Sequence, residues 1–253
     1  RDIEGVPSLR TKAVAWYDKL EAGPALGKFY LDWLLLRKSV AAIRSFRPDV
    51  IHGHLHEGAA IGLAARLLAG SKAPVVFDVQ GSLTGELDSY GWLDRLPLAR
   101  PAFRLVERFI NRHSHQLVGS NIAVSQFLVR EMGLPADRVC TIIDGVHMNF
   151  FEGDRTRDLK AELGIDPERP VVLYTGALLS SKGVDNFFQA IPLVLKQAPA
   201  AFFLVVGYPV EQSQKLVREL GVADQVLFVG QVDYFELPDY LRIGDVAVDP
   251  KVE

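Results

Sequence analysis

The stretch VVLYTGALLSSKG, residues 171–183, decides the fold class of this chain. Its first five residues are almost all apolar, which is typical of a strand that is buried on both faces of a parallel sheet. A glycine follows the strand at once, and the pattern that begins at Lys182 predicts a helix over residues 182–196. Because strand, turn and helix in this order form the repeating unit of α/β folds, the stretch predicts a parallel sheet.

The same alternation extends along the chain in both directions. Strands are predicted at residues 49–52, 74–79, 122–124, 139–143, 171–175, 201–206, 225–229 and 245–248. Helices are predicted at residues 28–46, 58–69, 100–113, 126–132, 182–196, 210–220 and 235–243. This order predicts α/β architecture of the doubly wound type, with helices on both faces of each sheet.

A polar segment near residues 150–170 predicts a boundary between two domains. Residues 164–170, GIDPERP, place one glycine and two prolines within seven positions, and these residues break regular structure. We therefore expect one Rossmann-like domain over residues 1–155 and another over residues 156–253. A long helical segment precedes the first predicted strand, and the chain ends directly after the last, so both domains are expected to be incomplete.

The composition excludes several classes of protein. With 49% hydrophobic and 23% charged residues among 253, the chain is typical of globular proteins. A net charge of −3 argues against a nucleic-acid coat, which needs a basic surplus to neutralise phosphates. Cys140 is the only cysteine, so no internal disulfide forms, and a reducing, cytoplasmic location is expected. No apolar run is long enough to predict a membrane-spanning helix.

Alternating histidines occupy residues 51–57, IHGHLHE, at the end of a predicted strand. If the strand continues, His52, His54 and His56 share one face, and with the following carboxylate they could ligate a metal. A metal-dependent hydrolase is therefore one alternative function. A packed histidine, or an active-site histidine without metal, is the other interpretation of the same pattern.

Two turns that follow predicted strands are candidates for ligand binding. The glycine turn at 176–183 leads into a helix, and a helix N-terminus with Lys182 beside it favours phosphate. Residues 77–86, FDVQGSLTGE, have the glycines and hydroxyls of a substrate loop. A plain surface turn is the other interpretation of each pattern. A non-catalytic α/β binding module stays open as a further alternative.

Four arginines recur at every fourth residue of the helix predicted over 100–113, so they form one stripe: Arg100, Arg104, Arg108 and Arg112. A basic amphipathic helix can lie on an anionic membrane surface, which makes a peripheral membrane contact one interpretation. The other interpretation is a solvated face that is partly paired with Glu107.

Several motifs run along the chain in a familiar order. Residues 48–54, PDVIHGH, are followed by the strand and QGS loop of residues 74–82. Further landmarks lie at residues 122–125, 144–151, 176–183, 226–232 and 245–250. Over roughly residues 48–253, this order and spacing resemble those of the family 4 retaining glycosyltransferases, which have the GT-B fold.

The resemblance implies a hexosyltransferase-like reaction, in which a sugar moves from a nucleotide-diphospho-sugar to an acceptor with retention of configuration. It implies a sugar, lipid-linked or small-molecule acceptor, and neither a cofactor nor a bound metal. The donor-binding residues that it implies are Gly176, Lys182, Gly230, Gln231 and Val232. The catalytic residues are Lys182, Glu253 and His52, and the acceptor-side residues are His54, Gln80, Gly81 and Ser82.

The chain departs from the family pattern at several positions. The arginine of the family's diphosphate site is Ala177, the loop histidine is Gln80, and the NGVD motif has Asp144 and His147 in place of asparagine and aspartate. The family's first glycine-rich loop is expected to precede the chain, and its E-x7-E motif to begin at about Glu253. The 253 residues alone are therefore expected to lack transferase activity.

Overall fold

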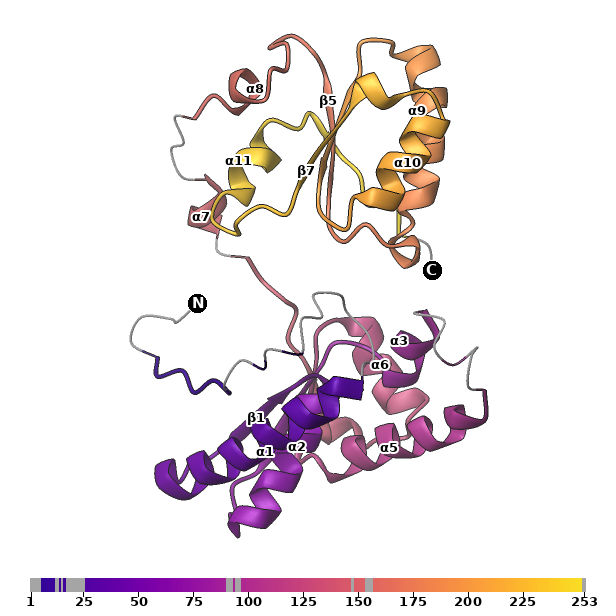
Figure 1. Cartoon of the computed structure of the whole chain (residues 1–253). Coiled ribbons are helices and arrows are strands. Elements are labelled where there is room, and N and C mark those ends of the chain that lie inside the picture. The colour runs from indigo at the N-terminus through magenta and orange to yellow at the C-terminus, as the bar shows by residue number, and fades with distance from the viewer. Residues whose placement is uncertain are drawn as a thin grey trace. The chain divides into compact units, whose positions relative to one another are not determined.

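The structure is a computed structural model that describes residues 6–11, 14, 16, 26–89, 93, 97–146, 148–152 and 157–251. The chain divides into two compact units, Arg1–Gly145 and Val146–Glu253 (Figure 1). The domain change expected between residues 155 and 156 falls within residues 153–156, which lie outside the described residues.

The first unit contains a four-stranded parallel sheet in the order β1-β2-β3-β4. Its strands are β1 (Ile51–His54), β2 (Val75–Val79), β3 (Gln116–Gly119) and β4 (Val139–Thr141). Its helices include α1 (Leu26–Phe46), α2 (Leu55–Ala69), α3 (Leu83–Ser89), α5 (Arg100–His113) and α6 (Ile122–Arg130), with 3-10 turns at Pro97–Ala99 and Ala136–Arg138. Helix α2 packs on β1 and β2, and α1 packs on α2.

The side chains of β2 alternate between the buried core of this unit and its polar edge. Phe77 and Val79 are buried and pack with Leu117 of β3, beneath side chains of α2, α5 and α6. Because successive side chains of a strand point to opposite faces, Asp78 lies on the other face from Phe77. The register places Asp78 opposite His54 of β1.

The strand predicted at residues 122–124 is wrong, because these residues form the first turn of α6. The side chain of Asn121 accepts a hydrogen bond from the N–H of Val124 at 2.9 Å, which is a helix N-cap. The strand that completes the sheet is β3 instead. It was not predicted, because Gln116–Gly119 contains only two strongly apolar residues.

The second unit contains another four-stranded parallel sheet, in the order β7-β6-β5-β8. Its strands are β5 (Val171–Thr175), β6 (Phe202–Val206), β7 (Val226–Gly230) and β8 (Val246–Ala247). Its helices include α7 (Met148–Glu152), α8 (Leu159–Glu162), α9 (Val184–Gln197), α10 (Glu211–Glu219) and α11 (Leu237–Arg242), with 3-10 turns at Ser180–Lys182 and Ala223–Gln225.

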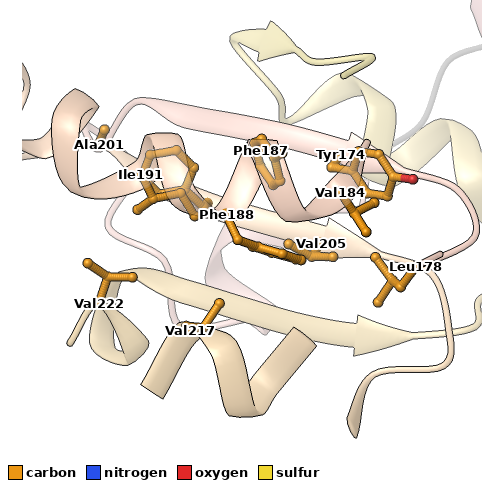
Figure 2. Close-up of a cluster of buried hydrophobic side chains, with 11 residues drawn as sticks. Tyr174, Leu178, Val184, Phe187, Phe188, Ile191, Ala201, Val205, Val217 and Val222 are labelled. Atoms are coloured by element: carbon orange, nitrogen blue, oxygen red, sulfur yellow. The ribbon is translucent and has the colours of Figure 1, made fainter. Parts of the chain in front are cut away.

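Alternate residues of β6 build two apolar clusters, one on each face of this sheet. Phe203 and Val205 join the cluster under α9 and α10, which Figure 2 shows. Leu204 and Val206 join the cluster that also contains residues of α8 and α11. Helices therefore cover both faces of β6, as Figure 1 shows for this unit, and the strand is buried on both sides.

The two parallel sheets confirm the predicted α/β class. Strand β5 and helix α5 have the bounds that the sequence predicted. The segment predicted as a substrate loop contains a helix, α3, which the apolar pattern did not indicate. In the described ranges, no helix combines the length and the apolarity that a membrane crossing needs.

Candidate functional site

Three polar side chains form a hydrogen-bonded chain at the carboxyl edge of the first sheet. His54 Nδ1 lies 3.0 Å from Oδ2 of Asp78, and Gln80 Nε2 donates to Oδ1 of Asp78 at 3.0 Å. Because an ionised carboxylate only accepts hydrogen bonds, Nδ1 of His54 is the donor, and in the neutral imidazole Nε2 is then an acceptor for a ligand. The ring is 62% exposed, so a ligand can reach it.

The three histidines do not share a face, so that expectation is wrong for His56. Strand β1 ends at His54, and Leu55 begins α2 with a left-handed φ of 60°. His52 stays near the edge, with Nε2 3.7 Å from Asp78 Oδ2, whereas His56 is buried edge-on against Phe77. Among the described residues, no three His, Cys, Asp or Glu side chains gather as metal ligands.

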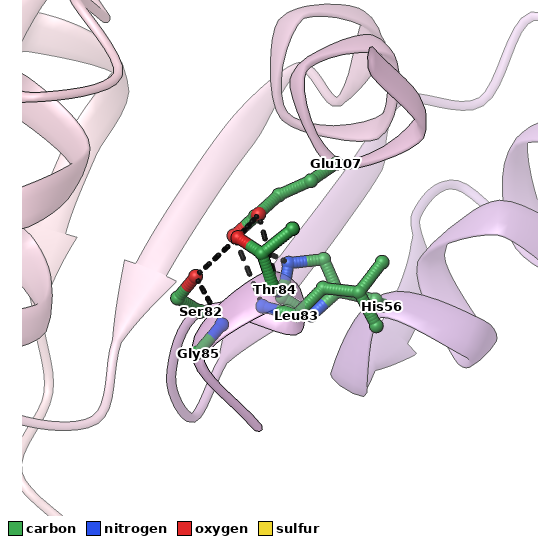
Figure 3. Close-up of polar contacts among 6 residues, drawn as sticks. All are labelled: His56, Ser82, Leu83, Thr84, Gly85 and Glu107. Carbon is green, nitrogen blue, oxygen red and sulfur yellow. Dashed lines mark hydrogen bonds and ion pairs between the residues drawn. The ribbon is translucent and has the colours of Figure 1, made fainter. Parts of the chain in front are cut away.

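A fully buried glutamate, Glu107, holds the turn that follows Gln80 (Figure 3). Its Oε1 accepts from the N–H of Leu83 at 3.0 Å, and its Oε2 accepts from the hydroxyl of Thr84 at 2.7 Å. Ser82 joins this network through its hydroxyl, 3.1 Å from that of Thr84. The expectation that Glu107 pairs with the arginine stripe is therefore wrong, because its carboxylate faces the interior.

Burial also sets the charge of the histidine beside this glutamate. Nε2 of His56 lies 3.7 Å from Oε1 of Glu107, which is beyond hydrogen-bonding distance. Burial lowers the pKa of His56, and the carboxylate of Glu107 opposes that shift. His56 is therefore neutral at pH 7, and the hydrogen-bond donors that face Glu107 come from the turn at 83–84.

Backbone hydrogen bonds donated by two glycines join the carboxyl ends of β5, β6 and β7 in the second unit. The N–H of Gly176 donates to Val206 at 3.0 Å, and the N–H of Gly207 donates to Gly230 at 2.8 Å. A Cβ at Gly207 would lie 1.8 Å from the carbonyl oxygen of Gly176, so no other residue fits there. Gly176 and Gly230, which the sequence selected, thus lie on one edge with Gly207 between them.

A tyrosine side chain holds the turn after β5 through a hydrogen bond. The hydroxyl of Tyr174 donates to the carbonyl of Ala177 at 2.9 Å, and the N–H of Leu178 donates to Tyr208 at 3.0 Å. Burial, and to a lesser extent the charge of Asp249, raise the pKa of Tyr174. The phenol therefore keeps its proton, and Ala177 is held at the surface of the turn.

Lys182 lies at the point where this turn enters α9. It ends the 3-10 turn Ser180–Lys182 and is exposed, and Gly183 is the N-cap of the helix with a φ of 72°. Because the first N–H groups of a helix have no partner within it, this end favours negative charge. The backbone thus places the cation of Lys182 beside the N-terminus of a 14-residue helix.

The remaining donor-side candidates have different environments. Gln231 is exposed directly after β7, whereas Val232 is half-buried and packs against the core that contains Leu204. In the first unit, Gly81 is half-buried, and a Cβ there would meet no atom within 4 Å. Glu253 lies outside the described residues.

The structure adds Asp78, Glu107 and Gly207 to the residues that the sequence selected. One signal for Glu107 was available, because it is the only acidic residue of α5 and lies three positions before the apolar Ile110. An acid on the apolar face of a helix is buried only when hydrogen-bond donors face it. Nothing in the local sequence marks Asp78 as the partner of His54, since the contact spans two strands.

Known proteins match both units. Residues 1–145 match the family described as "Glycosyl transferase 4-like domain", and residues 155–252 match "Glycosyl transferases group 1". D-inositol 3-phosphate glycosyltransferase 2 of Catenulispora acidiphila is 27% identical over 219 residues, which cover 80% of this chain and 49% of that protein. The chain thus spans about half the length of that relative.

Two solved structures resemble the chain at low sequence identity. Sucrose-phosphate synthase from Thermosynechococcus elongatus has a TM-score of 0.75 at 20% identity, over 96% of this chain and 59% of that one. Anabaena HepE in complex with UDP-glucose has a TM-score of 0.66 at 19% identity, over 88% of this chain and 57% of that one. These likenesses support the GT-B fold, and because the first family match covers more than half of the 253 residues, the chain belongs to the glycosyl transferase 4-like, group 1 family.

Proposed function

We propose that this chain carries the donor and acceptor sites of an enzyme that transfers a sugar from a nucleotide-diphospho-sugar with retention of configuration. The proposal rests on the edge of the second sheet where Gly176, Gly207 and Gly230 lie, together with Lys182 at the start of α9. Charge develops on the diphosphate as the sugar leaves, and a cation next to a helix N-terminus stabilises that charge.

The residues of the second unit take the donor roles in this proposal. Lys182 contacts the diphosphate, Gly176 allows the backbone to approach it, and Gly230, Gln231 and Val232 lie beside the base. Glu253 contacts the sugar. Because Ala177 supplies no charge, Lys182 carries a larger share of phosphate binding than it would beside an arginine. The proposal requires no bound metal.

The residues of the first unit take the acceptor roles. His52, acting with His54, faces the reacting centre, and Gln80, Gly81 and Ser82 border the acceptor. The hydrogen bond from His54 to Asp78 supports this assignment, because it leaves Nε2 of an exposed imidazole to accept a hydrogen bond from an acceptor hydroxyl. The hydrogen bond from the acceptor hydroxyl to Nε2 would orient the hydroxyl oxygen for attack on the sugar.

The relatives suggest which probes to use first. HepE was solved with UDP-glucose, so a UDP-sugar is the donor to test first. The Catenulispora relative is named for D-inositol 3-phosphate, which supports a small phosphorylated polyol as the first acceptor to test. Sugar and lipid-linked acceptors complete the panel.

Calorimetry with UDP, ADP and GDP tests the donor site of the 253-residue chain directly. The proposal predicts saturable binding of at least one diphosphate, with weaker binding of the corresponding monophosphate, because Lys182 and α9 contact the second phosphate. Equal affinities for mono- and diphosphates would contradict the proposed site. Binding without any transfer, in a protein of the relatives' full length, would favour a non-catalytic binding module. That the 253 residues alone lack transferase activity stays a prediction, which a transfer assay tests.

We also propose a peripheral contact between α5 and the cytoplasmic face of a membrane, where a lipid-linked acceptor would lie. The outward face of α5 carries the exposed arginines Arg104, Arg108 and Arg112. Leu105 and Phe109 are also exposed there. A face that combines basic and apolar side chains can bind an anionic lipid surface. The single cysteine supports the cytoplasmic location.

A further inference from the structure

The hydrogen bonds of Glu107 reach beyond its own helix to the turn that follows Gln80. Its side chain is fully buried in the middle of α5, where an ionised carboxylate is costly unless hydrogen bonds replace its water. It accepts from the N–H of Leu83 at 3.0 Å, from the N–H of Thr84 at 3.3 Å and from the hydroxyl of Thr84 at 2.7 Å. All three donors belong to one two-residue segment.

That segment fixes the backbone of the turn before it. The hydroxyl of Ser82 lies 3.1 Å from that of Thr84 and accepts from the N–H of Gly85 at 3.1 Å. The carbonyl of Ser82 also accepts from the N–H of Glu86 at 2.9 Å. The position of residues 81–86 therefore depends on the carboxylate of Glu107. Figure 3 shows how Glu107 meets Leu83 and Thr84 and how Ser82 joins Thr84 and Gly85.

The turn continues directly into the polar chain at the sheet edge. Gln80 precedes Gly81 and donates to Asp78, which in turn accepts from His54. A shift of the turn would move Gln80 and alter the hydrogen bonds of Asp78. Buried Glu107 is thereby linked to the exposed imidazole of His54 through an unbroken series of hydrogen bonds and backbone.

We propose that Glu107 is the positioning residue of the acceptor side. It contacts no substrate; its carboxylate holds residues 81–86 so that Gln80 and Asp78 keep the Nδ1–H tautomer of His54, with Nε2 available to the acceptor. The role of Glu107 on the acceptor side rests on the proposed function, whereas its connection to His54 through hydrogen bonds and backbone does not. The experiment below therefore needs no ligand, and its failure is separate from a failure to bind or transfer sugar.

Glu107→Gln in the 253-residue chain tests the link. The amide oxygen can still accept hydrogen bonds, but the NH2 group replaces the other acceptor and faces donors, so the turn loosens. Hydrogen–deuterium exchange of residues 81–86 is expected to rise at least tenfold, with no change in peptides from the second unit. Glu131→Gln, which removes an exposed carboxylate after α6, is the matched control. If Glu107→Gln does not fold, Thr84→Val removes one donor and is expected to give a smaller local increase.

A spectroscopic readout separates positioning from general stability. Long-range proton–nitrogen NMR spectra at pH 8 are expected to show His54 mainly as the Nδ1–H tautomer in the parent chain and in Glu131→Gln. In Glu107→Gln, or in Thr84→Val, the spectra are expected to move towards a mixture of tautomers. Unchanged local exchange, or an unchanged His54 tautomer in a folded variant with a loosened turn, would overturn the proposal.

Discussion

A Cβ atom at Gly183 would lie 1.9 Å from the carbonyl oxygen of Pro250, so the turn that carries Lys182 is in direct contact with the segment that follows β8. Strand β8 pairs with β5, and the N–H of Val248 donates to Leu173 at 2.9 Å, which carries the chain past that turn. The position of Lys182 thus depends on a contact between segments that are far apart in sequence, and this contact requires glycine.

The Gly183 contact is expected to make Gly183→Ala strongly destabilising. A left-handed φ of 72° costs alanine about 1–2 kcal/mol, and overpacking against Pro250 adds about 1–3 kcal/mol. Gly221→Ala is the control, because Gly221 has a φ of 69° with no atom within 4 Å of its Cβ position. Urea unfolding of the second unit, followed by hydrogen exchange, is expected to show the larger loss for Gly183→Ala. Equal losses would mean that Pro250 moves aside freely.

Lys182→Ala is expected to weaken nucleotide-diphosphate binding by about 1.5–3 kcal/mol, the range for hydrogen bonds to charged groups. Lys196→Ala is the matched control, since it removes an exposed lysine from the other end of the same helix. Titration calorimetry with the diphosphate that binds best measures both variants. If Lys182→Ala binds as the parent chain does, Lys182 is not the phosphate contact.

Parts of the fold that depend on local pattern could be predicted, and parts that depend on distant contacts could not. The run VVLYT, with four apolar or aromatic residues before Thr175, was enough to place β5. Residues 122–124 also look like a strand, but the Asn121 cap turns them into a helix. His56 does not share a face with His52 because β1 ends at His54 and α2 begins at Leu55, whose left-handed φ is rare for leucine. Sequence placed Lys182 at a helix start, yet only the structure brings Pro250 against the following glycine.

Asp32 on α1 is expected to make the first unit less stable as the pH rises through 6. Burial, together with a hydrogen bond and the charge of Glu57, raises the pKa of Asp32 from 3.8 to about 6. The folded state therefore binds more protons than the unfolded state between these values, so this contribution is complete below 3.8 and is lost as the pH rises through 6.

Asp32→Asn imitates the protonated carboxyl and is expected to stabilise the first unit at pH 7 by on the order of 1 kcal/mol, since the site is partly solvated. All three tryptophans lie in the first unit, so their fluorescence reports its urea unfolding. Asp49→Asn, at an exposed carboxylate before β1, is the control. A parent chain and an Asp32→Asn variant with parallel stability curves from pH 4 to 8 would contradict the shifted pKa.

His56 is expected to act in the opposite direction. Because burial lowers its pKa, the unfolded state binds more protons than the folded state below pH 6.5, and stability is lost as the pH falls through that range. His56→Gln removes the titrating group, so its stability is expected to fall less between pH 7 and 5 than that of the parent chain. The same fluorescence measurement checks this, and an equal fall in both proteins would show that His56 does not carry the effect.

The outward face of α5 is expected to bind anionic liposomes through Arg104, Arg108 and Arg112, because Arg100 is held by Asp88 at 2.6 Å. Each arginine near an anionic surface contributes about 1 kcal/mol, so replacing all three by glutamine weakens binding on the order of a hundredfold. Replacing Arg47, Lys72 and Arg130 by glutamine removes the same charge from other exposed positions and is the control. Sedimentation with phosphatidylserine liposomes measures both, and binding is expected to fall with salt, since exposed charges are screened within about 10 Å at 0.1 M.

If both triple variants lose binding equally, net charge and not this helix attracts the membrane. If the parent chain stays in the supernatant with and without anionic lipid, α5 is a solvated face and the proposed membrane contact is wrong.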